Sequence, residues 1–403
     1  MLNQLFALRP DEKNRVFGLD VLRAIAVLTV VDAHAAGAMG QYAGAGVNPL
    51  HQIIPDGVEL FFVLSGFLIG GILIKLFERE PRFDGRVIAN FWTRRWFRTL
   101  PAYYLVLLSL IAWPVLRAWR SGVGTGLPPK AVLATYFVFL QNFAHGVYEF
   151  FPETWSLAIE EWSYLLLPTV LFVVSRLAPK TWPKQRVLLT VILLVIVSSN
   201  VGRLIQTVRI PLNIPDPELG YRGIVLTRLD AIAYGVLAAW LKQYRPQFWA
   251  GQWAQHTGFW LGIFLTVLVA FSSSIFILRY YVDLGVYPVY VLYKRSLYFL
   301  VMGLSMMLLV PRMDAWKTQS GWFVGVVTHI SLISYSMYLL NLSPIMEQII
   351  SRIPTTSAGV AYGKLALFWG LSVILPTVMY RFYEKPMTSL RDRVSKKEPH
   401  LTS

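Results

Sequence analysis

The sequence predicts an all-α membrane protein, a polytopic transmembrane helix bundle of about ten spans plus one re-entrant or interfacial segment. Of its 403 residues, 55% are hydrophobic and only 15% are charged, whereas soluble domains carry about 25% charged residues. The mean hydropathy is +0.51. This composition disfavours a cytosolic enzyme and excludes disorder, coiled coil and collagen. Apolar stretches of spanning length occur at 18–38, 57–76, 99–118, 155–177, 186–207, 223–242, 257–278, 293–311, 325–350 and 361–381.

A shorter apolar stretch at 131–147 contains Gln141, Asn142 and His145, and we expect it not to cross. With ten spans, both termini lie on one side of the membrane. Lys and Arg on that side outnumber those on the other by about two to one, and cytoplasmic loops carry such an excess. The sequence therefore predicts cytoplasmic termini and a re-entrant or interfacial piece at 131–147.

The formal net charge of +15 would suggest a nucleic-acid partner in a soluble protein. Here we assign it to basic cytoplasmic loops, and no nucleic-acid partner is expected. Cysteine is absent, which excludes disulfides, thiolate catalysis and Cys-ligated metals, and no metal is expected. The longest polar loop is short, so the chain is predicted to be a single membrane domain, 1–403, with cytoplasmic tails at about 1–17 and 385–403.

The first span contains four ionisable residues, Asp20, Arg23, Asp32 and His34. Such residues at membrane depth are costly and indicate function by default. Arg23 and His34 are eleven positions apart in the sequence. A rotation of only about 20° therefore remains between them, and they lie about 16 Å apart on one helix face. The shared face favours a polar channel. Taken singly, an Arg paired with Asp20 and a His satisfied by a neighbouring helix would explain each residue.

The second span, 57–76, carries Glu59 near its outer end, at about the depth of His34. A carboxylate that accepts from one imidazole nitrogen would fix the tautomer and leave the other nitrogen as a base. An interfacial Glu that faces water is the alternative. Gly66 and Gly70 form a small-xxx-small pair, which favours close helix packing over ligand binding.

The stretch 83–98 mixes cations with Trp and Phe before a span, as in an interfacial helix on the cytoplasmic face. It ends with Arg94, Arg95 and Arg98. Arg95 and Arg98 share a helix face, which suits binding of two phosphate groups. Anchoring to the headgroups of membrane lipids explains the same residues equally well.

Two later spans begin with ionisable residues. Glu160 and Glu161 lie a turn inside a span and are followed by Tyr164, so at least one of them is predicted to face a polar cavity. Arg228 and Asp230 open another span. For those two residues, an ion pair between neighbours or between helices is the favoured interpretation.

These residues resemble acyltransferase family 3. The resemblance rests on the Arg23-x10-His34 spacing, the Arg95-x-x-Arg98 pair and motifs that follow the family's order over most of the chain: VELFFVLSGFLI, TWSLAIEEWSYLLLP, TRLDAIAYGVLAA, ISYSMYLLNLSP and YEKP. It implies an integral-membrane enzyme of the bacterial inner membrane that moves an acyl group, usually acetyl, to a hydroxyl. The implied donor is cytoplasmic acetyl-coenzyme A, and the implied acceptor is a glycan or lipid-linked saccharide of lipopolysaccharide, exopolysaccharide or peptidoglycan type.

Residues and resemblance together predict a mechanism. We expect Arg95 and Arg98 to hold donor phosphates at the cytoplasmic mouth, with Arg23 further along the channel. An imidazole titrates near pH 6.5, which suits general-base catalysis, and acyl transfer through the imidazole itself is the alternative. The predicted catalytic residues are His34 as base, Glu59 as its orienting partner, and Glu161.

An oxyanion stabiliser is also required, and Asn142, Asn341 and Tyr164 are unranked candidates. Asn341 is a departure from the family, because many members carry His at this position. A catalytic role of that His is impossible here, although Asn can still donate a hydrogen bond.

Other functions remain open at this point. A transporter or lipid flippase would also have intramembrane charges and a polar channel. A scaffold subunit of an envelope complex would explain the hydrophobicity but not the placement of His34 and Glu59. Within the enzyme class, an acyltransferase that acts on a small molecule such as a macrolide is not separated from a glycan enzyme by the sequence.

Overall fold

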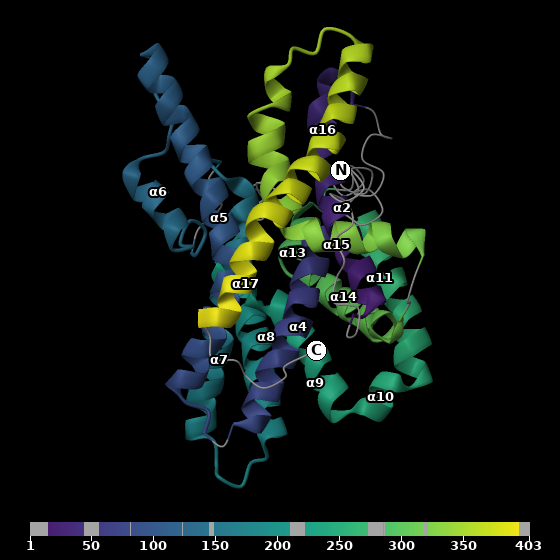
Figure 1. The fold of residues 1–403 in the computed structure, drawn as a ribbon. Coiled ribbons are helices and arrows are strands. Elements are labelled where there is room, and N and C mark those ends of the chain that lie inside the picture. The colour runs from purple at the N-terminus through teal and green to yellow at the C-terminus, as the bar shows by residue number, and fades with distance from the viewer. Residues whose placement is uncertain are drawn as a thin grey trace.

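The computed structural model describes residues 15–43, 56–80, 82–122, 124–144, 149–209, 222–272, 285, 287–317 and 321–394. Regular elements within these ranges are all helical, which confirms the predicted all-α polytopic bundle (Figure 1). The α-helices are α2 Phe17–Met39, α4 Gly57–Arg79, α5 Gly85–Ser121, α6 Lys130–Phe137, α7 Trp155–Leu177, α8 Lys184–Arg209, α9 Leu229–Tyr244, α10 Pro246–Ala250, α11 Gly258–Ser272, α13 Tyr287–Arg295, α14 Leu297–Ala315, α15 Trp322–Leu340, α16 Ala358–Met379 and α17 Lys385–Val394.

Among the described residues, 9 helices are long and apolar enough to cross a membrane, and they coincide with all but one of the predicted segments. The exception is 223–242. Helix α9 begins only at Leu229 and has 16 residues, so it is about 24 Å long against a hydrocarbon thickness of about 30 Å. A short 3₁₀ helix, Val225–Thr227, precedes it. The predicted segment is longer than α9 because it also includes the apolar residues of this 3₁₀ helix, which hydropathy does not distinguish from an α-helix.

Helix α9 packs directly on α4 in the middle of the bundle (Figure 1). The two backbones approach so closely that a Cβ added to Gly66 would lie 2.0 Å from a carbonyl oxygen of α9. One added to Gly235 would lie 2.0 Å from the carbonyl oxygen of Val63, and Gly70 meets the backbone of Val236. The prediction that Gly66 and Gly70 serve close helix packing is confirmed.

The predicted interfacial helix 83–98 and the predicted span 99–118 form one continuous helix, α5. Its 37 residues extend over about 55 Å. Asp84 caps the N-terminus by accepting from two backbone N–H groups. The predicted interfacial stretch is therefore helical and continues without a break into the span, because no helix-breaking residue stands at 98–99 and Pro101 is accommodated within the helix; its position at the interface stays a prediction.

The described part of 131–147 contains no helix long enough to cross a membrane. Its regular part is α6, with 8 residues and a length of about 12 Å. The prediction that this stretch is not a full span is confirmed for the described part, and His145 lies outside the described residues.

The two predicted tails are described only in part. The C-terminal tail predicted from residue 385 begins with α17, which packs against α5. Residues 1–14 and 395–403 lie outside the described residues, as do residues 273–278 of the predicted span 257–278.

The glycine contact generates a stability prediction. Gly66→Ala should lower the stability of the folded protein by about 1–3 kcal/mol, because the new methyl group forces α4 and α9 apart. The apparent melting temperature of the detergent-purified protein measures this effect.

Gly71→Ala is the matched control in the same helix, because a Cβ on Gly71 would meet nothing within 4 Å. Equal melting temperatures for the two variants would contradict the proposed role of the α4–α9 contact.

Candidate functional site

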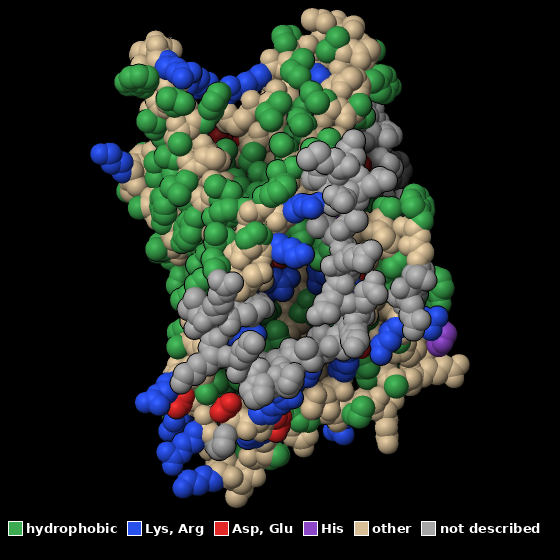
Figure 2. Space-filling model, viewed as in Figure 1, with side chains coloured by type: hydrophobic (Ala, Val, Ile, Leu, Met, Phe, Trp, Pro, Cys, Tyr) green, Lys and Arg blue, Asp and Glu red, His purple; other side chains and the backbone are tan. Residues whose placement is uncertain are grey.

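An inner cavity of about 110 Å³ lies between α2, α4, α5, α7 and α15. We define it by its charged residues: Arg23, Arg95, Arg98, Glu160 and Glu384. The predicted grouping of Arg23 with the Arg95–Arg98 pair is therefore present around one cavity. Figure 2 shows Lys and Arg side chains inside a hollow in the middle of the displayed face.

Two of the three arginines are held by the protein. Arg23 donates to Ser331 at 3.0 Å and lies 3.4 Å from the carboxylate of Asp20, so the predicted pairing with Asp20 is present. Arg95 donates to the Tyr164 hydroxyl at 2.7 Å, and its guanidinium lies 4.3 Å from the centre of that ring. These contacts fix the direction of both side chains.

Arg98 is different. Its side chain is exposed at the cavity, and no hydrogen bond, ion pair or ring contact joins it to any other described residue. Arg98 also lines an adjoining cavity together with Lys385, Thr388 and Ser389 of α17. A guanidinium that lines two adjoining cavities is available to an anionic ligand. Arg94, by contrast, lines neither cavity.

An outer cavity of about 130 Å³ lies further along α2. We define it by His34, Glu153, Trp155 and Arg222. The inner and outer cavities share Val58 and Tyr338 in their walls. Helix α2 therefore carries Arg23 at one cavity and His34 at the next, about 16 Å further along its axis.

Asn341 orients His34. The Nδ1 atom of His34 lies 2.5 Å from Oδ1 of Asn341. The Asn341 amide nitrogen donates to the carbonyl oxygens of Met337 and Tyr338 at 3.0 and 2.8 Å, which assigns its orientation because carbonyl oxygens only accept. Nδ1 therefore carries a hydrogen and donates, and in the neutral imidazole this leaves the lone pair on Nε2. Asn341 thus supplies the tautomer control that the sequence assigned to Glu59.

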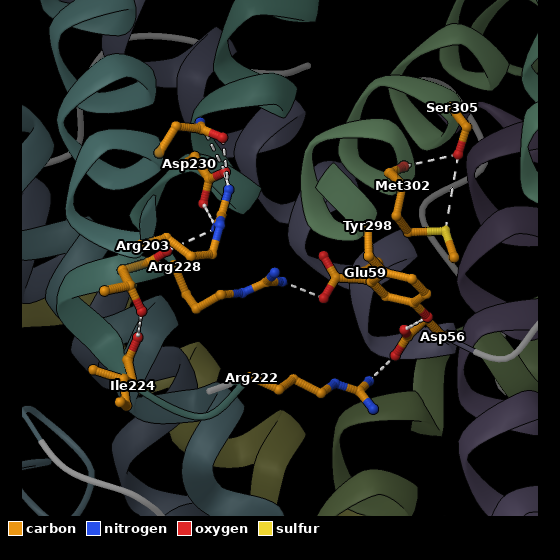
Figure 3. A network of polar contacts seen from close by, with 12 residues as sticks. Asp56, Glu59, Arg203, Arg222, Ile224, Arg228, Asp230, Tyr298, Met302 and Ser305 are labelled. Carbon is orange, nitrogen blue, oxygen red and sulfur yellow. Dashed lines mark hydrogen bonds and ion pairs between the residues drawn. The ribbon is translucent and has the colours of Figure 1, made fainter. Parts of the chain in front are cut away.

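The predicted bond between His34 and Glu59 was wrong. Figure 3 shows the Glu59 carboxylate bound to Arg228. The two side chains are 1% and 0% exposed, so they form a fully buried ion pair. Arg228 also lies over the ring of Phe299, 3.9 Å from its centre. The sequence could not reveal this pairing, because it joins residues 169 positions apart.

The same network contains a second buried pair. Arg203 binds Asp230 at 2.8 Å, and Arg222 and Tyr298 both bind Asp56 (Figure 3). The prediction that Arg228 and Asp230 form ion pairs between helices is confirmed. Burial lowers the pKa of Arg222 to about 10, so this side chain stays cationic at neutral pH.

Of the two adjacent carboxylates, Glu160 lines the inner cavity. This bears out the prediction that at least one of them faces a polar cavity. Glu161, the predicted catalytic member, is buried instead beside Thr99, which donates to it at 2.8 Å. Successive helical residues point about 100° apart, so only one of two neighbours could face this cavity.

The three candidate oxyanion donors are already engaged. Tyr164 donates its one hydroxyl hydrogen to Glu160 at 2.6 Å. Asn142 donates both amide hydrogens to carbonyl oxygens, those of Trp155 and Gly223, and Asn341 does likewise. None of them can stabilise an oxyanion without giving up a bond within the protein.

Sequence reasoning missed several residues at these cavities. Glu384 lines the inner cavity and accepts a hydrogen bond from Ser336 at 2.6 Å. It belongs to the YEKP motif, which supports the family resemblance but by itself predicts no role for this residue. Glu153 and Arg222 line the outer cavity. Glu153 stands directly before the TWSL motif, but one carboxylate near a span end gave no basis for singling it out.

Comparison with known proteins finds similarity to bacterial O-acetyltransferases. The chain is 33% identical over 163 residues to a putative peptidoglycan O-acetyltransferase, YrhL, of Bacillus subtilis, which covers 39% of this chain and 24% of the relative. It is 31% identical over 172 residues to the O-acetyltransferase OatA of Staphylococcus aureus, with 40% and 26% covered. It is 29% identical over 164 residues to the peptidoglycan O-acetyltransferase OatA of Listeria monocytogenes, with 38% and 24% covered.

The chain thus aligns with about a quarter of the length of these curated relatives. No solved structure matches it. The profile of the acyltransferase domain matches residues 16–379, nearly the whole chain, including both cavities apart from the segment around Glu384. The chain therefore belongs to acyltransferase family 3.

Proposed function

We propose that the chain is a membrane O-acetyltransferase that moves an acetyl group from cytoplasmic acetyl-coenzyme A to a hydroxyl of a cell-envelope glycan. One observation carries this proposal: the cavity with Arg98 and the cavity with His34 meet at a common wall, formed by Val58 and Tyr338. An acyl donor needs an anion-binding end and a base at its other end. The two cavities offer these groups in that order.

The inner cavity is assigned to the acyl donor because its arginines can bind phosphate groups. In the proposed complex Arg98, with its open guanidinium, binds donor phosphates, while Arg95 and Arg23 add positive field from fixed positions. The distance of about 16 Å along α2 from Arg23 to His34 suits an extended pantetheine arm. With 225–244 as a tenth crossing beside the nine long helices of the described residues, both termini lie in the cytoplasm of a bacterial inner membrane in this proposal.

The proposed chemistry uses the tautomer that Asn341 selects. Nε2 of His34 removes the proton from the acceptor hydroxyl while the hydroxyl oxygen attacks the thioester carbonyl. The carbon–sulfur bond breaks, the ester forms, and the departing thiolate takes the proton back from the imidazolium. The proton removed from the hydroxyl ends on the thiol of coenzyme A, so the reaction needs no further acid or base.

The names of the relatives support a glycan acceptor, because two of them are described as peptidoglycan O-acetyltransferases. In the proposed reaction the acceptor is an envelope saccharide of peptidoglycan, lipopolysaccharide or exopolysaccharide type. Labelled acetyl-coenzyme A and the purified protein in detergent test the reaction class, since a transporter or scaffold would neither transfer nor hydrolyse the acetyl group.

His34→Ala should reduce acetyl transfer by about 10²–10⁴-fold, the usual contribution of a general base. Transfer is measured with labelled acetyl-coenzyme A at saturating substrate. His329→Ala is the matched control, because His329 bonds Thr377 and lines none of the three cavities. Full activity of the His34 variant would refute the proposed base.

Arg98→Ala should raise the Michaelis constant for acetyl-coenzyme A about ten-fold or more, because a charge-assisted contact to phosphate is lost. The turnover number at saturating donor should change little. Arg94→Ala removes a neighbouring cation outside the cavities and should leave both constants near wild type. An unchanged donor constant for the Arg98 variant would indicate that this residue only anchors lipid headgroups.

Asn341→Leu should lower the turnover number about ten-fold or more, because His34 loses the acceptor that fixes its tautomer. The same substitution in the His34→Ala background should cause no further loss, as expected for residues that act as one unit. Additive losses in this double-mutant cycle would mean that Asn341 acts independently of His34.

A further inference from the structure

Glu153 is a buried carboxylate that the proposed mechanism does not yet use. It is 4% exposed and lines the outer cavity together with His34. Within the described part of the chain, no Lys, Arg or His forms an ion pair with it. A carboxylate held in a membrane protein without a cation is costly. Its retention beside the proposed base points to a partner that arrives from the cavity.

The carboxylate has hydrogen-bonding capacity left. Oε1 of Glu153 accepts from the backbone N–H of Ser343 at 2.9 Å, and Oε2 accepts from the Ser343 hydroxyl at 2.8 Å. Each carboxyl oxygen carries two lone pairs, and Ser343 uses one on each oxygen, so each oxygen has an acceptor position left. These bonds fix Glu153 in place and leave acceptor positions for hydroxyl donors in the cavity.

One turn of the chain positions both His34 and Glu153. The segment Asn341–Glu347 is a π-helix, with Pro344 inside it. Asn341, at its start, holds the imidazole, and Ser343, two residues later, holds the carboxylate. Local π-helical widening often occurs at functional sites. Here it brings an amide and a hydroxyl from one turn to two groups that line the same cavity.

The remaining wall suits a sugar ring better than a simple alcohol. Trp155 and Tyr338 supply aromatic rings, and Arg222 supplies a cation. Aromatic faces accommodate the apolar C–H face of a sugar, and a carboxylate accepts from its hydroxyl edge. An isolated alcohol would have no hydroxyl left for Glu153 once its only one was aligned with His34.

We infer that Glu153 is an acceptor-binding residue that accepts a hydrogen bond from a hydroxyl next to the one that is acetylated. The substrate class is then a vicinal polyol, such as a sugar ring with adjacent hydroxyls. This inference rests on the proposed function and deepens it, because it assigns the outer cavity to the acceptor and names the group that orients it.

Glu153→Gln is the decisive variant, because it keeps the size of the side chain and can still bond to Ser343 while it replaces one of the two acceptor oxygens by a donor NH₂ group. The measurement uses purified full-length protein in detergent, labelled acetyl-coenzyme A, and a glycan extract from envelopes of cells that lack the protein. Michaelis constants are determined for both substrates, and donor hydrolysis is measured without glycan. Glu149→Gln, an exposed carboxylate four residues earlier, is the matched control.

The expected result is an increase of about ten-fold or more in the apparent Michaelis constant for the glycan, as for loss of a hydrogen bond to a charged group. The donor constant and donor hydrolysis should stay at the wild-type level. Ser343→Ala should give a smaller increase, because the backbone N–H bond to Glu153 remains. Glu149→Gln should match the wild type.

Two outcomes would overturn the inference alone. The first is an unchanged apparent Michaelis constant for the glycan in Glu153→Gln. The second is a parallel loss of donor hydrolysis, glycan affinity and melting temperature, which would show that Glu153 is purely structural. A wild-type protein that neither hydrolyses acetyl-coenzyme A nor transfers acetyl to the extract would overturn the proposed function itself. The two kinds of failure are therefore distinguishable.

Discussion

The packing of the helices around the outer cavity depends on the buried ion pair between Arg228 and Glu59. Removing one partner of such a buried pair leaves an uncompensated charge and costs about 3–5 kcal/mol. The pair joins the start of α4 to the residues that precede α9, and Arg203–Asp230 joins α8 to the same region (Figure 3). Together these contacts fix how α4, α8 and α9 meet. The outer cavity, which has residues from the start of α4 in its wall, depends on that arrangement.

The same constraint identifies the groups that are not committed to structure. Two of the three arginines at the inner cavity are bound within the protein: Arg23 to Asp20, and Arg95 to the hydroxyl of Tyr164. Within the described part of the chain, Arg98 has no such partner, and Glu153 has only Ser343. These two residues lie at the cavities on either side of the common wall. A cation at one and a carboxyl group at the other offer different chemistry, which the proposed function assigns to two different substrates.

Hydropathy was sufficient to predict the bundle, because a spanning helix must be apolar over most of its length. The 3.6-residue period was sufficient to place Arg23 and His34 along one helix that lines both cavities. Partners across the bundle could not be predicted. Glu59 was within reach of His34 by depth, yet it faces Arg228, because depth fixes only one coordinate of a side chain. Likewise, the engaged donors of Asn142 and Tyr164 depend on backbone carbonyls and neighbours that only the tertiary structure reveals.

The wall of Val58 and Tyr338 has a consequence for the proposed donor. The hydroxyl of Tyr338 donates to the backbone oxygen of Glu153 at 2.8 Å and bonds to Ser156 at 2.6 Å, so its ring is anchored across the bundle. In the proposed reaction the acyl end of the donor must pass beside this ring to reach His34. The anchored position of Tyr338 would therefore set how thick a donor arm can pass from one cavity to the other.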